Sequence, residues 1–194
     1  MEILNGSNMD RYERLREDWF ALLRQGERIV ATANSDSHFA SRPIGTPRNY
    51  VAYEGEVVPP SKFDSQRFVR AVLDGKLYGT TGPIVDVSLD GAQLGETHSG
   101  KSGTLRVDVR SAPWVDVDEV LVYVNGRRTV AKRIASDGRL EFPLTFEEDS
   151  FVTVEVRGEP SNDYRLLLSK YIPFAFTNPI WIDADDDGTW ASPG

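Results

Sequence analysis

The sequence predicts an α+β chain in which a partial α/β segment is followed by a β-sandwich. Before Gly75, apolar residues recur with the 3.6-residue period of helices, around one short run that is apolar throughout. After Gly75, apolar residues alternate with a period of two, which is typical of half-buried strands. With 194 residues, the chain can form one ordinary domain, or a small domain and part of another.

The first segment contains a predicted helix and a buried strand. Asp10 and Glu13 form a capping box in which Asp10 is the expected N-cap. Gly26 is expected to end the helix. Its apolar stripe consists of Leu15, Trp19, Leu22 and Leu23. Residues 29–33 are continuously apolar, which favours a strand inside a parallel sheet. Residues 1–6 resemble the end of a strand followed by a turn, so we expect the chain to begin inside a larger domain.

A second helix is predicted before the change of period. Residues 50–53 are expected to form a short strand between prolines. Ser61 is the expected N-cap of the helix, Asp64 occupies N3, and Gly75 ends it. The expected apolar face consists of Phe68, Val69, Val72 and Leu73.

Short alternating strands separated by glycine turns occupy the middle of the chain. Asn125-Gly126 is a strong signal for a tight hairpin. The expected strands are centred on residues 85–89, 105–109, 120–124, 129–131, 140–144 and 152–156. This spacing predicts an immunoglobulin-like β-sandwich over residues 78–170, without the cysteine pair of antibody domains.

The last segment, residues 171–194, is apolar at first but is interrupted by Pro173 and Pro179. Because proline cannot donate to a strand ladder, we expect this segment to be an extended strap rather than a central strand or a helix. The chain is therefore divided into an α/β segment (residues 1–77), the sandwich (78–170) and the strap with its acidic tail (171–194).

Composition excludes several classes of protein. The net charge is −8 and the basic residues form no stripe, which argues against a nucleic-acid partner. The absence of cysteine excludes disulfides, thiolate metal sites and a cysteine nucleophile. No apolar run approaches the roughly 20 residues of a membrane helix. The compartment is not fixed by these features.

Asp36 and His38 follow the predicted buried strand and are candidate metal ligands. Ligands bind beyond the carboxyl ends of strands in α/β sheets, and a carboxylate with an imidazole suits Zn, Mn or Fe. The alternative is that Asp36 caps a turn and His38 is a surface residue, because catalytic metals normally take three or more protein ligands.

The chain resembles PHP (polymerase and histidinol phosphatase) metallohydrolases, in particular their carbamate-ester hydrolase branch. The matching stretches are Ala33-Asn34-Ser35-Asp36-Ser37-His38 and residues 45–51, 71–76, 80–83, 89–91 and 175–183, which cover nearly the whole chain in order. The resemblance implies that residues 1–77 are a remnant of a distorted α/β barrel. It also implies a divalent metal (Zn, Mn or Fe) in the intact enzyme, with Asp36 and His38 as ligands. The family's opening H-x-H pair and its other ligands have no counterpart before Asp36, so the chain is expected to be a C-terminal fragment, inactive alone.

Two further residues near these motifs were considered. Arg48 is a candidate substrate contact, because a guanidinium can bind two oxygens of a phosphate or carboxylate; the alternative is a surface arginine that holds a proline-rich loop. His98 lies in a Gly/Ser-rich stretch and is expected to be a solvated loop residue rather than a ligand.

The acidic tail contains the first half of a calcium-loop pattern. Asp183, Asp185 and Asp187 are followed by Gly188, as in D-x-D-x-D-G. The twelfth position, where a bidentate Glu belongs, is Gly194. The sequence predicts at most a weak calcium site here, against the alternative of a solvated acidic turn.

Two functions remain open. In the first, the chain is part of a metal-dependent hydrolase that acts on a small-molecule ester of the phosphate, carbamate or a related type. In the second, the sandwich is a non-catalytic binding or architectural module. If the chain is a fragment of a barrel, its open strand edges predict self-association.

Overall fold

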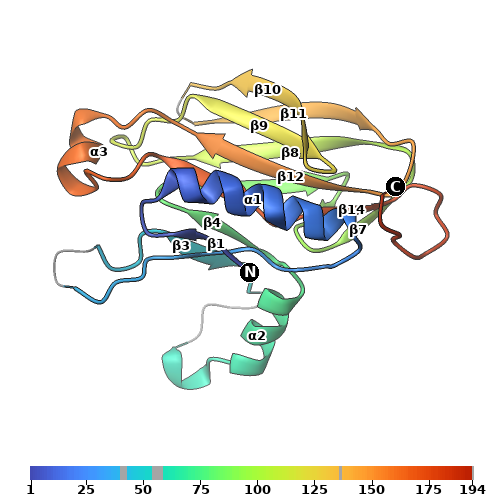
Figure 1. The fold of residues 1–194 in the computed structure, drawn as a ribbon, viewed down its shortest axis with the longest axis horizontal. Coiled ribbons are helices and arrows are strands. Elements are labelled where there is room, and N and C mark those ends of the chain that lie inside the picture. Colours follow the sequence, from blue (N-terminus) through green and yellow to red (C-terminus); the bar gives the residue numbers. More distant parts are fainter. Residues whose placement is uncertain (40–42, 54–58, 136, 194) are drawn as a thin grey trace.

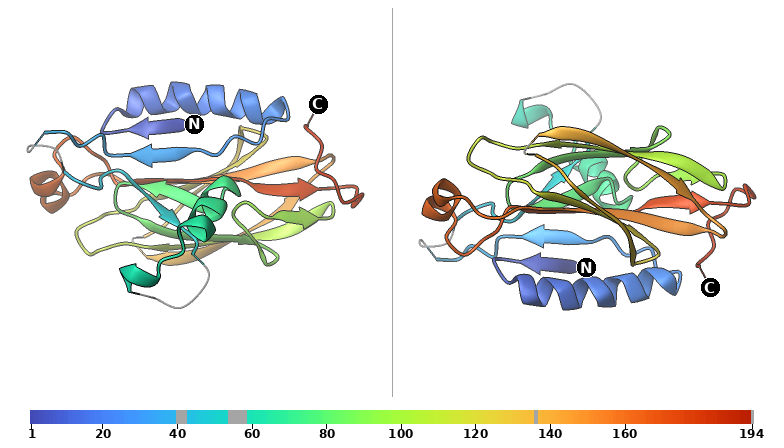
Figure 2. Two further views of the ribbon diagram at one scale, coloured as in Figure 1. Left: turned by 90° about the horizontal axis from the view of Figure 1, so that it is seen from below. Right: turned by 90° about the horizontal axis from the view of Figure 1, so that it is seen from above.

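The computed structural model describes residues 1–39, 43–53, 59–135 and 137–193; Gly194, the twelfth position of the calcium-loop pattern, lies outside these residues. The fold is mixed α and β with strands predominating, as expected (Figure 1). Two sheets are stacked, and α1 with a two-stranded sheet covers the outer face of the larger one (Figure 2).

The larger sheet has the strand order β10-β9-β12-β13-β4-β3, and β14 pairs with both β12 and β7. Its strands are β3 (Arg48–Val51), β4 (Leu77–Thr80), β7 (Thr97–Ser99), β9 (Glu119–Val124), β10 (Arg127–Arg133), β12 (Ser150–Arg157), β13 (Phe174–Thr177) and β14 (Ile180–Asp183). The smaller sheet has the order β11-β8-β5-β6. It consists of β5 (Ile84–Leu89), β6 (Ala92–Gln93), β8 (Ser102–Arg110) and β11 (Gly138–Thr145).

The alternating residues of the predicted strands form the core between the two sheets. Val85, Val87 and Leu89 from the smaller sheet are buried against Val152 and Val154 of the larger one. The predicted hairpin at Asn125-Gly126 is present, with positive φ at both residues, as a primed turn requires. Two sheets packed face to face are therefore confirmed, whereas the immunoglobulin-like type stays a prediction.

A parallel strand–helix–strand unit forms at the beginning of the chain, and the strand expected over residues 29–33 begins only at Thr32, in a sheet of two strands. β1 (Glu2–Asn5) and β2 (Thr32–Asn34) are parallel and are connected through α1 (Met9–Arg24). The predicted N-cap was wrong by two residues: Asn8, not Asp10, accepts the hydrogen bond from Arg11 N. Asn8 provides the same type of side-chain acceptor, and Asp10 lies in the first turn, where a negative charge is favourable.

The buried face of α1 differs from the expected one. Leu15 and Leu22 are only partly buried, although Trp19 and Leu23 are buried as predicted. Tyr12 and Phe20 take their places, because this side of the helix faces aromatic side chains of the larger sheet. The Tyr12 ring lies 4.7 Å from that of Phe174, and the Phe20 ring lies 5.6 Å from that of Tyr123.

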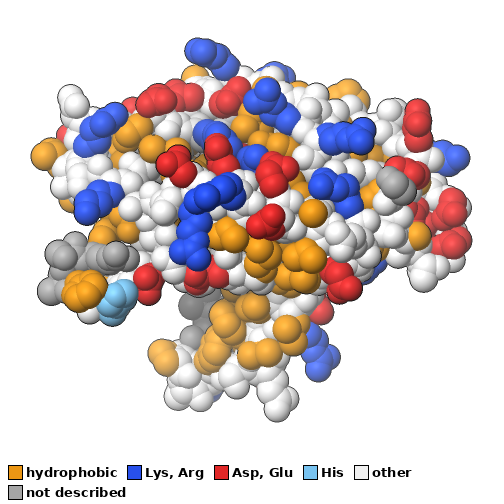
Figure 3. All heavy atoms as spheres, in the orientation of Figure 1, with side chains coloured by type: hydrophobic (Ala, Val, Ile, Leu, Met, Phe, Trp, Pro, Cys, Tyr) orange, Lys and Arg blue, Asp and Glu red, His pale blue; other side chains and the backbone are white. Residues whose placement is uncertain are grey.

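The second helix starts later than predicted. After a 3-10 turn, η1 (Pro60–Lys62), α2 spans Ser65–Leu73 and its N-cap is Asp64 rather than Ser61. Its apolar face is largely exposed: 52% of Val69 and 71% of Leu73 are accessible. Figure 3 shows hydrophobic side chains gathered on the protruding part of the molecule that carries α2.

The expectation for the last segment was wrong. Residues 174–177 form β13, a central strand between β12 and β4, and residues 180–183 form β14. The two prolines flank the strands instead of interrupting them, so no ladder hydrogen bond is lost. A helix that had not been predicted, α3 (Asn162–Leu167), precedes this segment.

Strands from all three predicted segments meet in the larger sheet. β3 precedes the expected boundary at residue 77, β4 crosses it, and β13 follows the boundary at residue 170. β13 pairs directly with β4, so the first and last segments are hydrogen-bonded to each other. In the part of the chain that the structure describes, no helix is long and apolar enough to cross a membrane.

A buried carboxylate connects α1 to the larger sheet. Glu155, on β12, is only 2% exposed. It accepts hydrogen bonds from Tyr12 Oη (2.6 Å), Arg16 Nη1 (3.0 Å) and Arg157 Nη2 (2.6 Å). Burial alone would lower the pKa of Arg16, but the adjacent Glu155 carboxylate raises it above its ordinary value. The charge is thus buried together with its partners, as a buried ion requires.

Two asparagine side chains form hydrogen bonds with the backbone at the edge of β2 that does not pair with β1. Asn178 Oδ1 accepts from Ala31 N (2.8 Å), while its Nδ2 donates to Ala31 O (2.9 Å) and to Leu77 O (3.1 Å). Asn49 repeats the pattern on Ala33, with distances of 2.8 Å and 2.7 Å. The two amides therefore replace the neighbouring strand that β2 lacks on this side.

We expect Asn178→Ala to lower the free energy of unfolding by about 2–4 kcal/mol, because buried backbone groups of Ala31 and Leu77 lose their partners. Urea denaturation would measure the change. Asn162→Ala, at an exposed position, is the control. Equal effects of the two substitutions would contradict the proposed importance of the amide.

Alkaline pH should destabilise the fold through two buried phenols. Burial raises the pKa of Tyr123 and of Tyr164 from 10.0 to about 12. Their contribution is fully present below pH 10, and it is lost as the pH rises to about 12, because only the unfolded chain ionises in this interval. Tyr123→Phe and Tyr164→Phe should each reduce the fall in the free energy of unfolding over this range. An unchanged pH dependence in both variants would contradict the prediction.

Candidate functional site

The loop that follows β2 brings Asp36 and His38 together. β2 ends at Asn34, and Asp36 adopts a left-handed backbone conformation with φ of 48°. His38 Nδ1 lies 3.3 Å from Asp36 Oδ1, and the two side chains are 55% and 45% exposed. Both residues therefore lie beyond the carboxyl end of a parallel strand, as the sequence predicted.

The distance between these two atoms is compatible with a shared metal ion. Two ligands at about 2.0–2.1 Å from a tetrahedral ion lie about 3.3–3.4 Å apart. An Asp–His ion pair has a similar separation, so the distance fits either arrangement. Among the described residues, no third Asp, Glu or His joins Asp36 and His38 in a cluster of potential ligands.

Arg48 begins β3, close to this loop in the fold. Its neighbour Asn49 is hydrogen-bonded to the backbone of Ala33, which holds the start of β3 beside β2. The guanidinium of Arg48 donates from Nη1 to Gly45 O at 2.8 Å and lies 5.6 Å from the centre of the Tyr50 ring. Arg48 thus stabilises the proline-containing turn before β3, which is the structural role considered for it.

Sequence reasoning missed a polar network at the same end of β1 and β2. Glu2 accepts hydrogen bonds from Asn5 Nδ2 (2.6 Å) and from Asn34 Nδ2 (2.5 Å). The available signal was Asn34, which directly follows the predicted buried strand and precedes Ser35-Asp36.

The acidic tail forms a different cluster from the one expected. Asp183 and Asp185 lie within 4.8 Å of Asp149, measured between carboxylate oxygens. Asp187, the expected third member, instead accepts hydrogen bonds from Thr189 N and Oγ1, both at 2.8 Å. These bonds lower the pKa of Asp187. The sequence pattern missed Asp149 because pairing of β12 with β14, not proximity in the chain, brings it to the tail.

Backbone hydrogen bonds hold this acidic cluster in place. Asp183 is buried and accepts from Asp187 N (3.2 Å) and Gly188 N (2.9 Å). Asp149 accepts from Ala184 N (2.8 Å) and Ala191 N (2.7 Å). Desolvation, and after it the charge of Asp187, raises the pKa of Asp185. An added cation would favour the ionised form of Asp185.

His98 lies elsewhere. It belongs to β7, which is paired with β14, rather than to a loop as expected. Its Nε2 lies 3.0 Å from Ser102 O. Pairing with β14 orders this segment despite its glycine and serine content. Because His98 lies away from the Asp36–His38 loop, its substitution can serve as a control for substitution of His38.

Comparison with known proteins gives no assignment: no family model, no curated protein and no solved structure matches the chain.

Proposed function

We propose that this chain contributes part of the metal site of a hydrolase that acts on phosphate, carbamate or related esters. Asp36 and His38 would hold a divalent ion (Zn, Mn or Fe), and Arg48 would bind an anionic oxygen of the substrate. The observation that carries the proposal is the 3.3 Å separation of His38 Nδ1 and Asp36 Oδ1 beyond the end of β2. The resemblance of residues 33–38 to the last metal-binding segment of PHP metallohydrolases supports it.

The roles of these residues follow from their chemistry. Asp36 would neutralise part of the charge of the ion, and His38 would supply a neutral nitrogen ligand. Arg48 would need to exchange its bond to Gly45 O for bonds to the substrate. A bound divalent cation would supply Lewis-acid polarisation of the ester oxygen.

Two ligands are too few for a preorganised catalytic site. The remaining ligands would therefore come from residues that the described structure does not bring to Asp36 and His38. We accordingly expect this chain by itself to bind the metal weakly and to hydrolyse no ester.

The alternative function is a non-catalytic binding or architectural module. It is favoured by the core between the two sheets, which is formed without any contribution from the Asp36–His38 loop. This alternative predicts that metal neither binds at that loop nor stabilises the fold.

Zinc titration separates the two functions. We expect Zn²⁺ to bind with a dissociation constant in roughly the micromolar to millimolar range, as for a site with only two protein ligands, and to raise the melting temperature. Isothermal titration calorimetry and thermal unfolding would measure both effects. His38→Ala and Asp36→Asn should abolish them.

His98→Ala is the matched control, because it removes the other histidine and should leave zinc binding unchanged. Binding that persists in His38→Ala, or that disappears in His98→Ala, would contradict the assignment. An absence of binding would favour the non-catalytic module. Assays of the unmodified chain with 4-nitrophenyl phosphate and with a 4-nitrophenyl carbamate should show no metal-dependent hydrolysis.

We also propose a weak calcium site at the acidic tail. Its support is the convergence of Asp149, which precedes β12, with Asp183 at the end of β14 and Asp185 in the following loop. Carboxylate oxygens are the ligands that Ca²⁺ prefers, and the three negative charges repel one another without a cation.

Calcium at millimolar concentration should raise the melting temperature by a few degrees at about ten times the dissociation constant, because it binds only the folded chain. Asp185→Asn should remove this shift. Asp163→Asn, at an exposed position on α3, is the control. If calcium raised the melting temperature of Asp185→Asn as much as that of the unmodified chain, the site would be excluded.

A further inference from the structure

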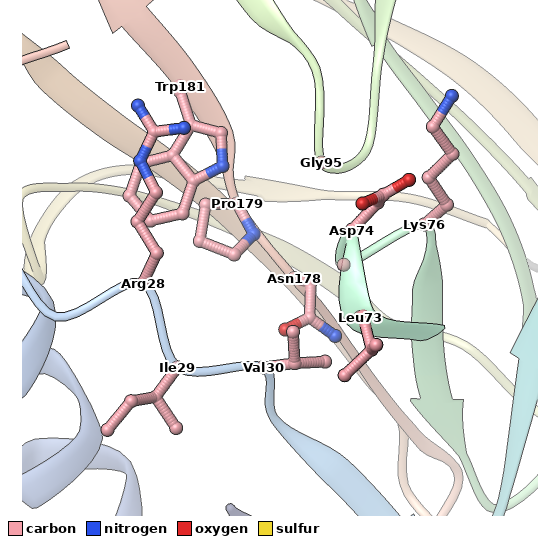
Figure 4. A pocket seen from close by; sticks show the side chains of 11 residues that line it. Arg28, Ile29, Val30, Leu73, Asp74, Lys76, Gly95, Asn178, Pro179 and Trp181 are labelled. Atoms are coloured by element: carbon pink, nitrogen blue, oxygen red, sulfur yellow. The ribbon is translucent and has the colours of Figure 1, made fainter. Parts of the chain in front are cut away.

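A pocket of about 340 Å³ lies at the amino end of β2, opposite the end that carries Asp36 and His38 (Figure 4). It is formed by residues 28–30, by the end of α2 with residues 74–76, and by the segment Asn178-Pro179. Its volume falls in the range of about 300–1,000 Å³ that is typical of small-molecule sites.

Gly95 allows the pocket wall to close. A Cβ atom on Gly95 would lie 2.0 Å from the carbonyl oxygen of Asp74, and φ at Gly95 is 81°. The backbone of Gly95 also donates to Pro179 O at 2.7 Å. The end of α2 and the segment after β6 are therefore in direct backbone contact, which fixes Asp74 on one side of the pocket.

Two tryptophan rings hold Arg28 on the other side. The Arg28 guanidinium carbon lies 4.7 Å from the centre of the Trp181 ring and 4.9 Å from that of Trp190. The two indoles meet at 63°, and Trp190 Nε1 donates to Ser150 O at 2.8 Å. Contact with the rings occupies the face of the guanidinium and leaves its N–H edges available for a planar anion.

The remaining polar side chains of the pocket already have partners. The amide of Asn178 is used by the backbone of Ala31 and Leu77. Lys76 Nζ lies 3.0 Å from Glu96 Oε1. The Gln93 backbone N–H, and then Lys76, lower the pKa of Glu96, which keeps this pair charged.

Arg28 and Asp74 differ from these groups. Within residues 1–39, 43–53, 59–135 and 137–193, neither the Arg28 guanidinium nor the Asp74 carboxylate has a hydrogen bond or an ion pair. Figure 4 shows them on opposite sides of the pocket, with Pro179 between them. The pocket thus presents one unpaired charge of each sign across an apolar middle to which Val30 and Leu73 also contribute.

We propose that this pocket binds a small zwitterion, an amino carboxylate whose carboxylate pairs with Arg28 and whose ammonium group pairs with Asp74. The aliphatic part of the ligand lies against Val30, Leu73 and Pro179. A ligand with one charge would satisfy only one side of the pocket. This site is separate from the Asp36–His38 loop and does not depend on the proposed hydrolase function.

A series of ω-amino acids tests the proposal and measures the spacing of the two charges. Glycine, 4-aminobutanoate and 6-aminohexanoate would be titrated into the full chain while the tryptophan indole N–H signals are followed by NMR. We expect saturable binding of at least one member, with a dissociation constant in roughly the millimolar range, as for charge pairs open to solvent. Butanoate and butylamine should bind at least about tenfold more weakly than that member, because each lacks one of the two charges.

Substitutions locate the binding. Arg28→Gln and Asp74→Asn should each weaken it about tenfold or more, and Asp74→Asn preserves the shape of the side chain. Arg14→Gln and Asp18→Asn, on the exposed side of α1, make the same changes away from the pocket and should have no effect. Melting temperatures would verify that each variant is folded.

Three outcomes would overturn the proposal. The first is no saturable shift with any member of the series. The second is binding of butanoate or butylamine as strong as that of the best ω-amino acid. The third is binding that Arg28→Gln and Asp74→Asn leave unchanged.

Discussion

The arrangement of this molecule depends on one constraint: the backbone groups on the side of β2 that faces away from β1 need hydrogen-bond partners. β2 pairs with β1 on one side, and the backbone groups of Ala31 and Ala33 face the other side. Buried N–H and C=O groups need partners, and here Asn178 and Asn49 provide them with their side-chain amides. Each amide accepts a hydrogen bond from the N–H group of one residue and donates one to its C=O group, as a neighbouring strand would. The β1–α1–β2 unit is therefore attached to the larger sheet without a strand between them.

Two of the three proposed sites, the Asp36–His38 loop and the pocket between Arg28 and Asp74, follow from this attachment. Asp36 and His38 belong to the loop after β2, and Arg28 belongs to the segment before it. Asn178 lines the pocket between Arg28 and Asp74, and it also forms a hydrogen bond with Ala31. The same residue therefore shapes the pocket and fixes the position of β2. The attachment is reinforced by Glu155, whose bonds to Tyr12 and Arg16 fix α1 on the same face of the sheet. Removing one partner of such a buried charge is costly, because the remaining charge loses its compensation.

Local patterns in the sequence predicted a large part of the fold. The strand and turn signals located β5, β8 and β11 of the smaller sheet and β9, β10 and β12 of the larger one. The hairpin at Asn125-Gly126 has the turn that its residues require. The errors arose where several side chains could serve equally well: Asn8 rather than Asp10, and Asp64 rather than Ser61, cap the helices. The prolines of the last segment were misinterpreted, because a proline pattern does not distinguish a broken strand from two intact strands with prolines at their ends.

The sequence by itself determined which residues share a face and where the chain turns, since period and turn chemistry are local properties. It also indicated the pair Asp36 and His38, which are two positions apart. Only the tertiary structure decided what covers each face: Phe20 of α1 is buried by Tyr123, whereas Leu73 of α2 stays exposed. It likewise decided which distant residues come together, as Asp149 meets Asp183 and as Arg28 and Asp74 line one pocket. The physical reason is that strand pairing and the satisfaction of buried backbone groups act between segments far apart in the chain, and no local pattern records them.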